Sequence, residues 1–442
     1  MLKGIRLNII IVAVLIFGIG SVAEAQNESA LGSLTPYSLF GIGDIAKQGS
    51  AINTAMGGIG IGVRDNRYIN YLNPASITKR DTLSFMFDFG LYQKNTITTD
   101  GRNRKAPFNT LNISHITLTA PIYGKTAVIA GVSPISSVGY NFTEVETDLN
   151  LINDHGSIGY SKYGNGYVSR LFLGVSTILF KNLSIGVEGN YYFGNIKHHS
   201  DILFGGNGTA LTGPHIQRKI EIGKENSIKS MGGKIGMQYE KNLNEEISLT
   251  LGGTWSFSSN LSGDMVNYSY AKNSISGTTD TVKYETYNRD YKMPSELGLG
   301  FSIRKRDKWL VGMDYIRQDW SKSKFEDTPG VNFQTIAANS FRFGVEYIPN
   351  RYDVRYYLKR ASYRVGTYYD QSYMKIGAQQ INAMGVTLGM TLPIPPLYNA
   401  IGISVDMGQR GKLDNNLLRE RYVMFNVSIS LHEIWFRKIR YD

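Results

Sequence analysis

Along much of the chain, apolar and polar residues alternate with a period of two. Four apolar residues in the run FNVSISLH (425–432) are each followed by a polar one. The runs LSFMFDFGL (83–91), ISLTLGGTWSF (247–257) and LGLGFSI (297–303) follow the same rule. Because successive side chains of a strand point to opposite faces, each run predicts a strand with one apolar and one small or polar face.

This pattern predicts about 14 strands, an even number that is typical of outer-membrane barrels. The predicted strands are 83–93, 109–121, 125–133, 166–180, 183–195, 226–241, 245–258, 294–305, 308–319, 338–349, 357–370, 381–391, 399–408 and 421–433. The connections alternate between short and long, and the long ones are 94–108, 134–165, 196–225, 259–293, 320–337, 371–380 and 409–420. Short turns at one end and long loops at the other favour an all-β, transmembrane antiparallel barrel, since closure leaves no strand edge in lipid.

The N-terminus predicts export. Lys3 and Arg6 precede an apolar run that ends at Ala23-Glu24-Ala25, which is a small-x-small cleavage pattern. We therefore expect residues 1–25 to be a signal peptide and the mature chain to be a multi-pass barrel of the bacterial outer membrane. No later apolar run reaches the roughly 20 residues that a membrane helix needs. The 442 residues include no cysteine, which excludes disulfides and thiolate metal sites.

The net charge of +11 bears on partners. An exported basic protein meets anionic lipid head groups first, so outer-membrane lipid and lipopolysaccharide are the expected contacts, and nucleic acid is not. Arg102, Arg104 and Lys105 in an outer loop suit lipopolysaccharide phosphates, although solvated loop charge is the preferred interpretation. A periplasmic tail is expected at 434–442, where basic residues follow Trp435 and Phe436.

A segment without strand periodicity, residues 26–82, precedes the barrel strands at 83–433. Its glycines are dense, at Gly57, Gly58, Gly60 and Gly62, and permit positive φ and close backbone approach. The run Asn73-Pro74-Ala75 predicts a fixed turn, because proline restricts the residue before it and an asparagine side chain bonds nearby backbone. An ordinary turn before the first strand is one interpretation, and a plug inside the barrel is the other.

On these residues the chain resembles FadL-type outer-membrane transporters of long-chain fatty acids and other hydrophobic compounds. Asn73-Pro74-Ala75 looks like the hallmark of that family's lumenal hatch. TPYSLFGIGD (35–44), AMGGIGIG (55–62) and MPSELGLGFS (293–302) look like its Bacteroidota branch, which includes PorV-like barrels of type IX secretion. The resemblance covers the mature chain and implies a hatch at 26–82. Its motifs indicate the architecture of the protein well, but they say little about which molecule it would carry.

Alternation also places charged and polar side chains on the inner face of the wall. A wet lumen tolerates such groups, whereas lipid does not. We favour a structural network that holds the hatch, with Arg64 or Arg67 as partners, over a polar permeation path. The candidate lumen residues are Asp88, Asn112, Arg170, Glu188, Asp314, Arg342, Glu346 and Asp406.

The alternation slips by one residue in the second strand. Leu111 and Ile113 are apolar on one parity, whereas Ile116 and Leu118 continue on the other. One extra residue at Ser114 or His115, a β-bulge, accounts for the slip. FadL-type barrels have a strand kink that opens the wall sideways, so the bulge is a candidate lateral gate; a bulge at a barrel rim is the plainer interpretation.

Enzymatic chemistry is not predicted. The six histidines fit no metal-ligand spacing, and neither H-E-x-x-H nor G-x-S-x-G occurs. No metal or cofactor is expected. Two functions stay open, with passive uptake of small hydrophobic molecules placed first. The alternative is a non-transporting scaffold subunit, PorV-like, of an outer-membrane secretion or barrel-assembly complex.

Overall fold

The computed structural model describes residues 34–80, 84–205, 216–273, 276–323, 325, 331–395, 399–414 and 417–434. Most of them belong to one antiparallel sheet of 18 strand segments. Segment β1 (Asp44–Ile45) lies inside the barrel, and three strands of the wall are each interrupted once, so the described residues form a wall of 14 strands. This confirms the predicted barrel. The predicted signal peptide (1–25) and residues 435–442 of the predicted tail lie outside the described residues.

The wall closes on itself. Its last strand pairs with its first over the full length of both, from Arg419↔Thr99 to Ile434↔Ser84. The strands are β2 (Ser84–Thr99), β3 (Lys105–Pro121), β4 (Ala127–Val145), β5 (Ile158–Phe180), β6 (Leu183–Gly205), β7 (Ile216–Asn242), β8 (Ile247–Ser256) with β9 (Ser259–Asn273), β10 (Thr279–Met293) with β11 (Glu296–Lys305), β12 (Trp309–Asp319), β13 (Phe333–Thr335) with β14 (Ala337–Tyr347), β15 (Ser362–Ile376), β16 (Gln379–Ile394), β17 (Asn399–Arg410) and β18 (Arg419–Ile434).

The alternation in the sequence separates the two faces of the wall as predicted. On β18, Ile429 and Leu431 are 40% and 45% exposed, whereas Ser428 and Ser430 are buried. The apolar face therefore points outward, towards lipid, and the small polar face points into the barrel.

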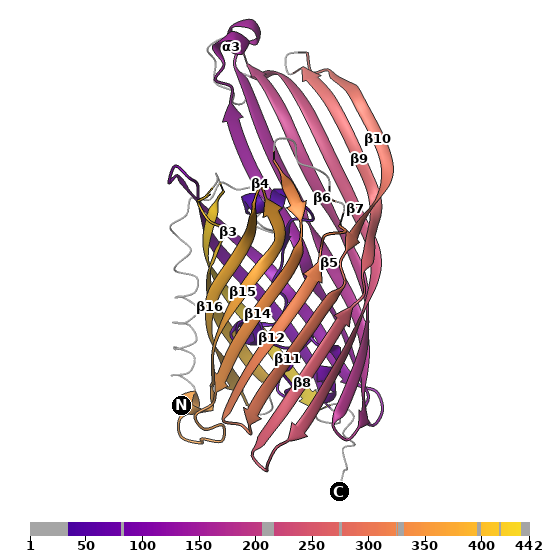
Figure 1. Cartoon of the computed structure of the whole chain (residues 1–442), viewed down its shortest axis with the longest axis vertical. Helices are drawn as coiled ribbons and strands as arrows, with labels where there is room; N and C mark the ends of the chain where they lie inside the picture. Colours follow the sequence, from indigo (N-terminus) through magenta and orange to yellow (C-terminus); the bar gives the residue numbers. More distant parts are fainter. Residues whose placement is uncertain are drawn as a thin grey trace.

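Five of the predicted long loops are wrong. Residues 94–108 and 371–380 lie mainly in β2 and β3 and in β15 and β16, which meet in tight turns, and three longer predicted loops differ more. Residues 134–165, 196–225 and 259–293 lie mainly in strands, since β4, β5, β6, β7, β9 and β10 continue past the predicted ends. These extensions rise beyond the rim that the other strands form, with the short helix α3 (Leu149–His155) at the tip of one hairpin (Figure 1). They carry polar residues on both faces, for example Lys197 and Glu225 on one face and His198 and Lys224 on the other, so no apolar period marks them as strands.

The other helices are short: η2 (Pro36–Leu39), α2 (Ala51–Thr54), η3 (Pro74–Thr78) and η5 (Tyr357–Arg360). No helix in the described part of the chain has the length and apolar character that a membrane crossing requires. The first three belong to residues 34–80, here called the lumenal segment, which lies within the barrel (indigo in Figure 1).

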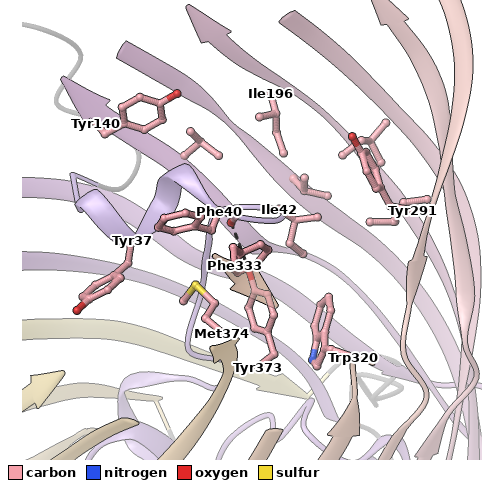
Figure 2. Packing of buried hydrophobic residues seen from close by; sticks show 14 of the residues in the cluster. Tyr37, Phe40, Ile42, Tyr140, Ile196, Tyr291, Trp320, Phe333, Tyr373 and Met374 are labelled. Carbon is pink, nitrogen blue, oxygen red and sulfur yellow. Dashed lines mark hydrogen bonds between the residues drawn. The ribbon is translucent and has the colours of Figure 1, made fainter. Parts of the chain in front are cut away.

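Apolar side chains of the lumenal segment join those of the wall in a core. Tyr37, Phe40 and Ile42 pack among wall residues near the long end of the barrel (Figure 2). The rings of Phe40 and Phe333 stack at 5.0 Å. Two smaller clusters, around Tyr71 and around Met56, lie elsewhere along the segment. Packed side chains therefore join the lumenal segment to the wall at several places along its length.

Candidate functional site: the lumenal segment and its wall contacts

Short local structures position the lumenal segment. At α2, the Asn53 carboxamide oxygen accepts the backbone N–H of Ser50 at 3.1 Å, which caps the first turn. At η3, Asn73 is the N-cap and Pro74 the first residue, a position where the missing N–H of proline costs nothing. The predicted turn at Asn73-Pro74-Ala75 is thus a capped 3-10 turn.

Asn73 also ties this turn to the wall. Its side-chain oxygen accepts the N–H of Ala75 at 3.0 Å, and its amide group donates to the carbonyl of Ile61 at 3.0 Å and that of Met237 in β7 at 3.1 Å. Ser176 of β5 donates to the carbonyl of Pro74 at 2.6 Å. Asn73 and Ala75 are fully buried, so these contacts exclude water.

The glycine-rich stretch lies directly against wall backbone. Gly57 has φ of +68°, which disfavours any other residue. A Cβ on Gly252 of β8 would lie 2.0 Å from the carbonyl oxygen of Ile61, and one on Gly366 of β15 would lie 2.1 Å from the Gly57 nitrogen. Glycine on both partners lets the two backbones meet. At these positions the inward glycines make room for the lumenal segment itself.

Asp314 of β12 holds the same stretch by its backbone. Its carboxylate accepts the N–H groups of Gly60, Ile61 and Gly62 at 2.6, 2.8 and 3.4 Å. From the neighbouring strand β14, Arg342 donates to the carbonyl of Gly58 at 3.1 Å. Three successive N–H groups aimed at one buried carboxylate form a charge-assisted set that fixes the loop.

At the short-turn end, two buried carboxylates and three guanidinium groups form one network. Arg67 of the lumenal segment contacts Asp65 and lies 2.7 Å from Glu346 of β14. Arg304 of β11 lies 2.7 Å from Asp65 and 3.4 Å from Glu346, and Arg364 of β15 also contacts Glu346. Arg67 therefore pairs with a wall carboxylate, as the sequence suggested, while Arg64 lies 3.6 Å from Glu240.

Nearer the long end, ion pairs hold the start of the segment. Lys47 lies 2.6 Å from Asp406 of β17, which also accepts the Tyr368 hydroxyl at 2.8 Å. Asp44 lies 2.5 Å from Arg410 and 3.4 Å from Lys94. Burial alone would raise the pKa of the Asp44 carboxyl, but the charges of Arg410 and Lys94 outweigh burial and lower it to about 2. The carboxyl is therefore ionised at neutral pH.

The remaining candidate lumen residues bond within the wall. His115 and Ser430 each lie 2.6 Å from the buried carboxylate of Asp88. Arg170 pairs with Glu188 at 3.5 Å across β5 and β6. The Asn112 side chain shares a hydrogen bond with Tyr92. The eight candidates thus divide into Asp314, Arg342, Glu346 and Asp406, which contact the lumenal segment, and Asp88, Asn112, Arg170 and Glu188, which do not in any described contact.

A register shift occurs at the predicted bulge. Gly90 pairs with His115 and Leu91 with Ile113, so Ser114 is the extra residue on β3. On the other side of β3, the ladder with β4 extends only from Pro121↔Ala127 to Ile116↔Val132. We call the unpaired stretch beyond these residues the β3–β4 seam. The bulge coincides with its lower end, and β4 has a register shift of its own between Pro134 and Ser136.

The lumenal segment covers the β4 side of the seam. Segment β1 pairs with β4 through Asp44↔Ser137 and Ile45↔Ser136. The N–H of Ala46 donates to the carbonyl of Ile135 at 2.8 Å, and that of Thr35 to the carbonyl of Gly139 at 2.9 Å. The edge of β4 is thereby satisfied from inside the barrel between Ile135 and Gly139.

A cavity of about 310 Å³ lies beside the lumenal segment and reaches the seam. Phe108, Thr110 and Ser114 of β3 contribute to its lining, as do Ile135 and Ser137 of β4. Ten of the side chains around it are Asp, Glu, Lys or Arg. The lining is mixed, because these charged groups lie beside aliphatic and aromatic side chains such as Ile42, Tyr71 and Trp320. Ligand pockets for hydrophobic molecules are lined mainly by apolar side chains with a few polar groups, so this lining alone does not decide the cargo.

Some contact residues are missing from the sequence-based candidates. Arg304 could have been found, since alternation puts it on the inward face with Gly300 and Ser302. Asp44, Lys47 and Asp65 could not, because the lumenal segment has no period that assigns its side chains to a face. Among the described residues, no cluster of histidine and acidic side chains could hold a metal ion.

Fold and contacts together define an outer-membrane β-barrel of FadL-like fold. Three solved structures share that fold: a Pseudomonas aeruginosa FadL homologue (TM-score 0.59, 11% identity, 89% of this chain and 99% of that chain), the P. putida toluene transporter TodX (0.55, 16%, 88% and 99%) and the CymD monoaromatic hydrocarbon channel (0.55, 15%, 87% and 97%). At these identities the likeness concerns the fold alone.

The family model of BamG matches residues 1–442, the whole chain, and the protein belongs to the BamG family. No curated protein matches it.

Proposed function

We propose that this protein is an exported, non-transporting subunit of an outer-membrane barrel-assembly complex, on the PorV-like branch of FadL-type barrels. Its N-terminal segment is a fixed plug, and its outer wall is the working surface. This reverses the order that the sequence alone favoured. The function that the name BamG suggests is the second of the two alternatives, barrel assembly.

The observation that carries the proposal is the way in which the lumenal segment is fixed to the wall. It is held at the short-turn end by Arg67 and Glu346, in the middle by Asp314, and towards the long end by Lys47 and Asp406. Breaking a buried ion pair by removing one partner typically costs about 3–5 kcal/mol, and a moving plug would have to break several at once. A hydrophobic cargo supplies no charge to replace them.

Passive uptake is the second candidate. It is favoured by the cavity that reaches the β3–β4 seam, since hydrocarbon channels share this fold. In that mechanism Ser114 and His115 would mark the lateral gate and the lumenal segment would act as a hatch that moves.

A disulfide that locks the segment distinguishes the two. A Cβ placed on Gly402 of β17 would lie 3.7 Å from the Cβ of Ala51 in α2, within the 3.5–4.5 Å usual between disulfide-bonded cysteines. The chain has no cysteine that could form competing bonds. The double variant Ala51→Cys/Gly402→Cys is compared, oxidised and reduced, with each single variant, which reports the packing effect of the new side chains.

A fixed plug predicts that cells carrying the oxidised double variant assemble outer-membrane barrels at the level of the single variants. Native mass spectrometry of the parent, extracted in mild detergent, should give protein subunits bound to the barrel. Loss of function on oxidation alone, or a barrel isolated without subunits but with hydrophobic molecules retained, contradicts the proposal and supports uptake.

A further inference from the structure

The β3–β4 seam leaves one strand edge without a partner strand. Above Ile116, no strand in the described part of the chain pairs with the side of β3 that faces β4. The lumenal segment pairs with β4 there, through Asp44↔Ser137, and leaves the β3 edge open. The stretch without a partner strand runs from Lys105 to His115, on the order of 35 Å at about 3.4 Å per residue. Within it, Asn112 has a bonding partner of its own, so the unsatisfied edge is that of its neighbours.

An open edge of this length is costly in a membrane. Backbone groups that face hydrocarbon without a hydrogen-bond partner cost several kcal/mol each, and lipid cannot supply the bonds. Other strands of the wall, such as β8 and β11, have paired neighbours on both sides. A polypeptide backbone is the chemical group that satisfies a strand edge, as β1 does for β4.

The two faces of β3 specify the kind of strand that fits. Leu111 and Ile113 point outward and are 50% and 48% exposed. On the opposite parity Thr110 is buried, and Ser114 lines the charged cavity. A strand added at this edge would place one face in lipid and the other against a polar lumen. It must therefore alternate apolar and polar residues, as the strands of membrane barrels do.

We propose that β3 binds an amphipathic β-strand of a different outer-membrane barrel protein by edge-to-edge pairing across the seam. The inference deepens the proposed function and rests on it: a barrel-assembly subunit would hold the open edge of another barrel. Exposed Arg102 and Lys105 at the upper end of the edge favour an acidic residue at the matching end of the added strand.

Site-specific photocross-linking in cells tests the pairing on the full-length protein. The probe p-benzoylphenylalanine replaces Leu111 or Ile113, one variant at a time. Leu251 on β8 and Leu299 on β11 serve as matched controls, because they are 49% and 51% exposed and lie on strands paired on both sides. After irradiation we expect a heavier species, barrel plus a different outer-membrane protein, at 111 and 113 and at neither control.

If the two strands are paired, a second result is expected that proximity alone would not give. Moving the probe from Leu111 to Ile113 should move the cross-linked residue of the partner by two positions along one strand, as peptide mass spectrometry would show. Lipid adducts alone at all four positions, equal protein adducts at all four, or an adduct between two copies of this chain would each overturn the inference. Co-purification of subunits with the parent, without any adduct at the seam, would leave the proposed function standing and remove only the pairing.

Discussion

Gly252 and Gly253 are neighbours on β8 whose side-chain positions point to opposite faces of the wall. A Cβ on Gly252 would lie 2.0 Å from the backbone oxygen of Ile61, whereas one on Gly253 would meet nothing closer than Met237 Cγ at 3.6 Å. A main-chain oxygen cannot move aside by a change of side-chain rotamer. The backbone of Ile61 is also held in place, because its N–H donates to the Asp314 carboxylate. The fit between segment and wall is therefore set at single positions.

We expect Gly252→Ala to lower the stability of the folded barrel by about 1–3 kcal/mol, the usual cost of overpacking, and Gly253→Ala to leave it unchanged or slightly raised. The temperature at which the folded band disappears on semi-native gels measures this for both variants. Equal behaviour of the two would mean that the lumenal segment moves aside easily, which contradicts a fixed plug.

Among the elements, β3 departs from regular pairing, and the spacing of apolar residues in its sequence shows where. Outward residues Ile113 and Ile116 are three positions apart, so both Ser114 and His115 lie between them. Bulges bend a strand and increase its twist. With β4 also irregular at Ile135, the two strands diverge where the bulges occur.

Deleting Ser114 should close the seam without disturbing either half of β3. Leu91 would still pair with Ile113 and Phe89 with Ile116, and every outward residue would stay outward, since the spacing returns to two. Spin labels at Leu111→Cys on β3 and Asn141→Cys on β4 should move closer together in this variant. Deletion of Thr117 is the control: it also removes the extra residue, but it turns Ile116 towards the lumen and His115, which bonds Asp88, towards lipid, so it should destabilise the barrel. An unchanged label distance in the Ser114 deletion would show that the bulge does not hold the seam open.

A strand could be predicted from the sequence only where one of its faces contacts lipid and is therefore apolar. Strands in the lipid zone carry an apolar face, and their number, order and facing followed from alternation. The upper halves of β5, β6, β7, β9 and β10 have no such face, so their strand character comes from ladders between polar strands, which single-chain periodicity cannot detect. In the lumen, alternation identified Asp314, Glu346 and Asp406 as inward. Of their partners, Arg67 was suggested by the sequence, whereas backbone amides such as that of Gly60 could not be predicted, because they leave no mark in composition.

Across the whole molecule, the two ends of the barrel differ. The chain enters and leaves the wall at the short-turn end, where Ser84 pairs with Ile434. The extended hairpins and α3 lie at the opposite end (Figure 1). In outer-membrane barrels the short turns are periplasmic and the longer elements face outward. The β3–β4 seam lies on the side of β3 towards the long end, so it would open in the outer half of the membrane.

This orientation predicts a specific labelling pattern in cells, which the absence of native cysteine makes clean. Leu149 in α3 is 72% exposed, and Val354 in the turn between β14 and β15 is 98% exposed. We expect Leu149→Cys to react with a membrane-impermeant maleimide in intact cells, and Val354→Cys to react only after the outer membrane is permeabilised. The parent chain reports background labelling. The reverse pattern would place the extended wall in the periplasm and move the open β3 edge to the inner half of the membrane. In that case an added strand would approach from the periplasmic side, where newly exported barrel proteins arrive.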